Sequence, residues 1–149
     1  MNSVRNRTIY LIIIIMALGV APLVRAEMKP WNASAVLQLS DDLFAAARQL
    51  SIECRMSPPK YDDASSSGHL EFRYHVRHFV SVANDLSQAL EDGKSMMETQ
   101  PIFETLMSMM PELKRYSDKK TGGPWPVVSK SVVKVDDIVE ELAPYYAPR

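Results

Sequence analysis

The chain has 149 residues, of which 46% are hydrophobic and 23% charged, and its formal net charge is −1 at pH 7. This length suits one domain with a single core. Without a net positive charge, neither nucleic acid nor an anionic membrane surface is expected as a partner. The single cysteine, Cys54, excludes an internal disulfide. A cross-link between two chains stays open, but Cys54 falls in an apolar helical stripe and is predicted to be buried.

Residues 1–26 have the pattern of a secretory signal peptide. Arg5 and Arg7 precede an apolar run, and Ala26 is a small residue at the predicted cut. Cleavage there would leave residues 27–149 as a periplasmic or secreted domain with a net charge of −4, because the segment removed holds three arginines and no acid. The alternative is an uncleaved anchor, although the apolar run is shorter than the roughly 20 residues of a spanning helix. After cleavage, no stable membrane insertion is expected.

Two helices are predicted in the first half of the remaining chain, over about residues 33–55 and 69–92. Asn32 can cap the first helix with its side-chain oxygen, and Gly93 is expected to end the second. Residues 57–68 between them are polar and rich in Pro, Asp and Ser, so a loop is predicted there. The apolar stripes recur every three or four positions. They are Val36, Leu39, Leu43, Ala46, Leu50 and Cys54, then Phe72, Val76, Phe79, Ala83, Leu86 and Leu90.

Two further helices are predicted over about residues 99–117 and 128–143. Pro101 is expected in the first turn of the earlier one, Pro111 is expected to kink or break it, and Pro144 is expected to end the later one. Their stripes are Phe103, Leu106, Met110 and Leu113, widened by Ile102, Met109 and Tyr116, then Val128, Val132, Val135, Val139 and Leu142. Four amphipathic helices without a convincing strand predict an all-α fold, a single-domain antiparallel four-helix bundle.

Two groups of side chains are candidate metal ligands. Glu71, His75 and His78 are spaced at about one and two helical turns, so they could converge on a metal. No recognised zinc pattern accompanies them, and three exposed or half-exposed histidines on a polar flank are the favoured interpretation. The methionines could bind copper(I), but they are better explained as flexible core filler. They are Met96, Met97, Met107, Met109 and Met110.

No arrangement of residues indicates catalysis. The run Ser65 to Ser67 lacks the G-x-S-x-G context of a nucleophile, and no triad order is present. Adjacent acids such as Asp136 and Asp137 point about 100° apart on a helix, so they do not form a converging pair. The chain is therefore predicted not to be an enzyme.

The segment from Leu39 to Tyr116 resembles the cytochrome b562 and c′ group of periplasmic four-helix bundles. The residues that carry the resemblance are Asp42-Leu43, Ala45-Ala46-Ala47, Pro58-Pro59-Lys60, Phe72-Arg73, Ala89-Leu90 and Gly93-Lys94. The resemblance implies a four-helix bundle and, in its b-type members, haem b held by a methionine and a histidine. Here such a pair would be His75 with Met110 or Met56. The C-x-x-C-H motif of the c-type members is not in the sequence.

The leading expectation is an exported, non-catalytic helical bundle without a cofactor, which binds a protein or small-molecule partner. A homodimer is left open. The alternative is a periplasmic haem b or metal protein of electron transfer.

Overall fold

The computed structural model describes residues 29–56, 63–117 and 126–147 of the chain. The predicted signal peptide, residues 1–26, lies outside the described residues, and so do residues 57–62 of the predicted long loop. The three described ranges contain all four predicted helices.

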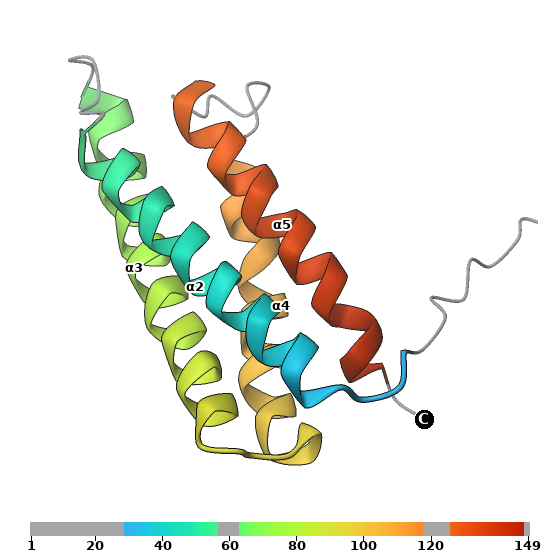
Figure 1. Cartoon of the computed structure of the whole chain (residues 1–149). Coiled ribbons are helices and arrows are strands. Elements are labelled where there is room, and N and C mark those ends of the chain that lie inside the picture. Colours follow the sequence, from blue (N-terminus) through green and yellow to red (C-terminus); the bar gives the residue numbers. More distant parts are fainter. Residues whose placement is uncertain (1–28, 57–62, 118–125, 148–149) are drawn as a thin grey trace, which may run out of the picture.

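The described residues form a bundle of four helices in which each helix runs antiparallel to its neighbours (Figure 1). The helices are α2 (Ala33–Met56), α3 (Asp63–Glu91), α4 (Met96–Ser117) and α5 (Pro126–Tyr146). Each helix packs on two neighbours, so α2, α3, α4 and α5 follow one another around the bundle and α5 returns to α2. No strand occurs in the described ranges. The prediction of an all-α, single-domain four-helix bundle is confirmed.

Side chains that flank the first turn define where α2 and α4 begin. At α2, Oδ1 of Asn32 accepts a hydrogen bond from the Ala35 N–H at 3.1 Å, which is the predicted cap. At α4, the Glu98 carboxylate accepts hydrogen bonds from the N–H and the hydroxyl of Ser95, at 2.9 and 2.7 Å. These bonds hold the pKa of the Glu98 carboxyl below its ordinary value. This Ser-x-x-Glu arrangement starts α4 three residues before the predicted position.

The beginning of α3 differs most from the prediction. The helix starts at Asp63, so residues 63–68 belong to it and not to the loop. Asp and Ser disfavour helix interiors, but the same residue types are favoured at helix starts. The composition of this stretch therefore fits either structure.

The end of α3 follows the prediction closely. Gly93 adopts a φ of 76°, a left-handed conformation that glycine tolerates without strain. Its N–H donates to the Leu90 carbonyl and the Lys94 N–H donates to the Ala89 carbonyl, each at 3.0 Å. This pair of hydrogen bonds forms a Schellman cap, and it lets the chain turn directly into α4.

Three prolines lie inside helices. Pro101 is in the second turn of α4, and the carbonyl that loses its donor there belongs to the exposed residue Met97. The helix continues through Pro111, so the predicted break at this position is wrong, whereas the predicted kink stays a prediction. Pro144 does not end α5, which continues to Tyr146 because that side chain is buried at the end of the bundle.

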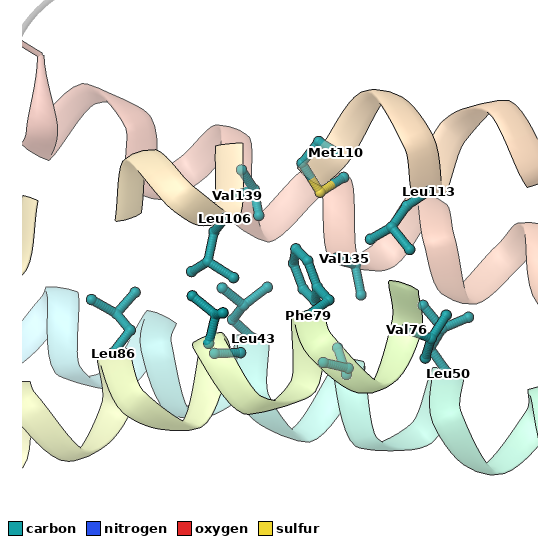
Figure 2. Packing of buried hydrophobic residues seen from close by; sticks show 14 of the residues in the cluster. Leu43, Leu50, Val76, Phe79, Leu86, Leu106, Met110, Leu113, Val135 and Val139 are labelled. Carbon is teal, nitrogen blue, oxygen red and sulfur yellow. The ribbon is translucent and has the colours of Figure 1, made fainter. Parts of the chain in front are cut away.

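The predicted stripes supply the core. Every stripe residue of α3 and α5 is buried, whereas Leu39 of α2 and the widening residues Ile102 and Met109 of α4 are only half-buried. Figure 2 shows Leu43, Phe79, Leu106 and Val135 meeting from the four helices. Burying one such side chain contributes roughly 1.5–3 kcal/mol relative to leaving it exposed. The side chain of Tyr116, predicted to widen the stripe of α4, lies outside the described residues.

Polar contacts between neighbouring helices fix their relative heights. The Ser87 hydroxyl donates to Asp41 at 2.6 Å, the Ser131 hydroxyl donates to Glu53 at 2.5 Å, and Lys114 Nζ lies 2.7 Å from Asp136 Oδ1. These contacts connect α2 with α3, α2 with α5, and α4 with α5. They place the second half of α2 beside the first halves of α3 and α5.

Candidate binding surface

The charged side chains of the bundle are divided between its two ends. The basic half contains the end of α2, the start of α3, the end of α4 and the start of α5, which meet at one end of the bundle in Figure 1. Among the described side chains, its charged residues are the basic Arg48, Arg55, Arg73, Arg77, Lys114, Arg115, Lys130 and Lys134 and the acidic Glu53, Glu71 and Glu112.

The opposite half is acidic, with a larger net charge of the opposite sign. Among the described side chains it contains Asp41, Asp42, Asp85, Glu91, Asp92, Glu98, Glu104, Asp136, Asp137, Glu140 and Glu141, with Lys29 and Lys94 as the basic residues. The bundle therefore has fields of opposite sign at its two ends, although its net charge is small.

This division was missed by the sequence interpretation, which considered only net charge. The signal is a change of sign within each helix: α2 and α4 go from acidic to basic, and α3 and α5 go from basic to acidic. Because neighbouring helices are antiparallel, the basic parts of all four helices lie at one end of the bundle and the acidic parts lie at the other.

The largest exposed apolar side chains of α3 lie in the basic half. Leu70 is 65% exposed and Tyr74 is 67% exposed. They belong to a face that points away from the buried stripe of α3. This outer face of α3 consists of the exposed residues Leu70, Tyr74, Arg77, His78, Ser81, Asp85 and Gln88. Exposed Tyr and Arg side chains next to each other are typical of protein interfaces.

The predicted metal ligands lie on and beside this face. The Tyr74 ring lies 5.9 Å from that of His75 and 6.5 Å from that of His78, centroid to centroid. His75 Nε2 is 4.0 Å from Glu71 Oε1. Among the described residues, however, no three or more His, Cys, Asp and Glu side chains are grouped so that they could hold a metal ion. The structure thus brings Glu71 and His75 together but does not gather His78 with them, and metal binding stays a prediction.

The predicted haem pair lies in two different environments. Met110 is 4% exposed and packs among Phe79, Leu113 and Val135 in the core (Figure 2). The side chain of His75 is 28% exposed at the edge of α3. Because the surroundings of Met110 are filled by packed side chains, they do not fit a haem without rearrangement. Haem binding by His75 and Met110 therefore also stays a prediction.

The other methionines do not share one environment. Met97 is 79% exposed and Met107 is 43% exposed, whereas Met96 and Met109 pack partly against the core. Met56, at the end of α2, is 78% exposed. Core filler therefore describes Met110, Met96 and Met109, but not the exposed methionines.

Two titratable side chains are buried where α2 and α3 meet in the basic half. Cys54 is 1% exposed, as predicted, and burial with the nearby Glu53 carboxylate raises the pKa of its thiol to about 12, against the opposing effect of Arg73. The thiol is therefore protonated and shielded, which disfavours a cross-link between chains. His69 is 6% exposed, so the expectation of an exposed or half-exposed histidine is wrong at this position. Burial and the Arg73 charge lower the pKa of His69, so its neutral form is favoured.

An aromatic cluster closes the opposite end of the bundle. Tyr146 stacks on Phe103 with ring centroids 4.3 Å apart, and the edge contact with Trp31 has a centroid distance of 5.5 Å. Its hydroxyl is 3.0 Å from Thr99 Oγ1. Burial raises the pKa of Tyr146, while this hydrogen bond opposes the rise. The Lys29 N–H donates to the carbonyl of Pro144 at 3.1 Å, so the cluster ties both ends of the described chain together.

Within the described ranges, none of the helices combines the length and apolar character needed to cross a bilayer. Comparisons of the chain with protein-family models, with curated proteins and with solved structures found no match. The resemblance to cytochromes b562 and c′ accordingly stays a prediction, and the structure shows an all-α four-helix bundle.

Proposed function

We propose that this protein is an exported, non-catalytic binding protein that engages an acidic partner through the outer face of α3. The observation that carries the proposal is the exposure of Leu70 and Tyr74, at 65% and 67%, beside Arg77 and His78 in the basic half. An exposed aromatic ring next to a guanidinium can anchor a partner by burial and by a charged hydrogen bond.

The charge of the basic half defines the chemistry of the partner. Arg73 and Arg77 lie on α3 at this end, and Arg55 from α2 and Lys130 from α5 add to them. A positive field attracts an acidic surface and speeds encounter with it. A protein surface rich in Asp and Glu is therefore the partner that complements this half.

The proposal can be tested with a defined peptide. The probe is a fluorescein-labelled amphipathic 16-residue peptide whose polar positions are all Glu, and the control probe has Lys at those positions. Fluorescence anisotropy should show binding of the Glu peptide alone. Tyr74→Ala and Arg77→Glu should each weaken it by about tenfold, the change expected from losing an interaction of roughly 1.4 kcal/mol.

The matched control is Arg48→Glu, which makes the same charge change on α2 in the basic half. It should change the dissociation constant by less than about threefold, because it alters the field without removing a contact of the α3 face. Equal effects of Arg48→Glu and Arg77→Glu, or equal binding of both peptides, would contradict the proposal. A Soret band in the purified protein would instead favour the haem alternative.

A further inference from the structure

The outer face of α3 has both signs of charge, so it can complement itself. Its basic residue Arg77 and its acidic residue Asp85 are both exposed, and none of the ion pairs within the described residues includes either of them. Resting on the function proposed above, we propose that the acidic partner is a second copy of this chain, with two α3 helices packed antiparallel about a two-fold axis at Ser81.

The spacing of three residues sets the register of this pairing. Arg77, Ser81 and Asp85 follow one another at intervals of four, so they form one ridge on the exposed side of α3. Arg77 and Asp85 are each four residues from Ser81, about 6 Å along the axis. A two-fold axis at Ser81 therefore brings Arg77 of each copy level with Asp85 of the other, and the same ion pair forms twice.

The pair Tyr74 and Gln88 agrees with this register. Tyr74 and Gln88 are each seven residues from Ser81, and both are exposed. The same axis places the Tyr74 ring of one copy beside the Gln88 amide of the other, where the phenol and the amide can form a hydrogen bond. Ser81 is small, so at the centre of the contact the two helix backbones can approach closely.

The charge division of the whole bundle acts in the same direction. When two copies pair antiparallel, the basic half of each lies alongside the acidic half of the other. A parallel pair would instead place like charges together. Electrostatic complementarity thus selects the antiparallel orientation, beyond the two ion pairs at the centre.

The expected dimer is weak and reversible. One helix face from each copy buries an area at the small end of protein interfaces. Exposed ion pairs contribute little individually and are screened by salt. The buried, protonated Cys54 does not supply a covalent link. A monomer–dimer equilibrium in the micromolar range or weaker, loosened by salt, is therefore expected.

The test is sedimentation equilibrium of the purified protein and of charge-reversal variants at low and high salt. Arg77→Asp and Asp85→Arg should each weaken self-association by about tenfold or more, since each places like charges opposite one another twice. The double variant R77D/D85R should restore it. An equimolar mixture of the two single variants should form a mixed dimer, because residues 77 and 85 are then paired with opposite charges at both contacts.

The matched control is again Arg48→Glu, which should leave the dimer constant within about threefold. Association weakened equally by Arg48→Glu, or no rescue in the double variant and the mixture, would overturn the pairing. A protein that stays monomeric at millimolar concentration and low salt would also overturn it. If that monomer still binds the Glu peptide through Tyr74 and Arg77, the proposed function stands without this inference; if the peptide test fails, both fall.

Discussion

Two tyrosines in opposite halves of the bundle have opposite surroundings. Tyr146 is 5% exposed, stacked on Phe103 and hydrogen-bonded to Thr99, whereas Tyr74 is 67% exposed beside two histidines on the outer face of α3. The first has its aromatic surface and its hydroxyl satisfied within the chain. The second leaves most of its ring to solvent. The aromatic cluster around Tyr146 therefore contributes to stability, and the outer face of α3 in the basic half is available for binding.

The largest change should come from Phe103. Phe103→Ala removes the ring that stacks on Tyr146 and leaves a cavity at the end of the core. A loss of about 3–5 kcal/mol in the free energy of unfolding is expected, as for other buried phenylalanines. Urea denaturation followed by circular dichroism measures it. A loss below about 1 kcal/mol would show that the cluster does not pack as described.

The hydroxyl of Tyr146 should have a smaller effect. Tyr146→Phe keeps the stacked ring and removes the hydrogen bond with Thr99, whose hydroxyl still has the carbonyls of Ser95 and Met96 within reach. The expected loss is about 0.5–1.5 kcal/mol. A double-mutant cycle with Thr99→Val isolates the pair. Additive losses in that cycle would mean that the two hydroxyls do not interact.

At the other end, His69 should make stability depend on pH. Burial and Arg73 lower the pKa of His69 from its ordinary value of 6.5, so the folded chain binds this proton less readily than the unfolded chain. Above about pH 6.5, His69 is neutral in both states and does not affect the free energy of unfolding. As the pH falls from about 6.5 through the lowered pKa of the folded state, the unfolded chain binds the proton more readily, so the free energy of unfolding decreases. Denaturation midpoints at pH 7.5 and 5.5 measure the change. The variant His69→Gln should show a smaller decrease, and an unchanged decrease would assign it to other groups.

The smallest effect on stability should come from Tyr74. Tyr74→Ala should change the free energy of unfolding by less than about 0.5 kcal/mol, because an exposed side chain away from caps and core contributes little. The same variant should still impair binding of the Glu peptide. If Tyr74→Ala destabilised the protein by more than about 1.5 kcal/mol, the contrast between the two tyrosines would fail.

The core could be predicted from the sequence because periodicity alone decides which side of a helix is buried. The stripe from Phe72 to Leu90 is buried without exception, since each position repeats every three or four residues. Helix ends were less predictable. The sequence of α3 between Asp63 and Gly68 suits both a loop and a helix start, and the extension of α5 to Tyr146 depends on contacts with distant residues.

The candidate binding surface was only partly accessible to sequence reasoning. Glu71, His75 and His78 are recognisable in the sequence as familiar metal ligands, whereas the exposed Leu70 and Tyr74 close to them match no ligand pattern. Their positions opposite the stripe were readable at 100° per residue. The division into a basic and an acidic half needed one more fact, the antiparallel order of the helices, before four separate gradients could be added together.

The hydrogen bond between Lys29 and Pro144 has a practical consequence. Because it brings the two described chain ends side by side at the aromatic end, a short linker could join them, and new termini could be opened between α2 and α3. Such a circular permutant should retain the four-helix packing. For the same reason, attachment to a solid support through the described residues at this end would direct the opposite half, with Tyr74, toward solution.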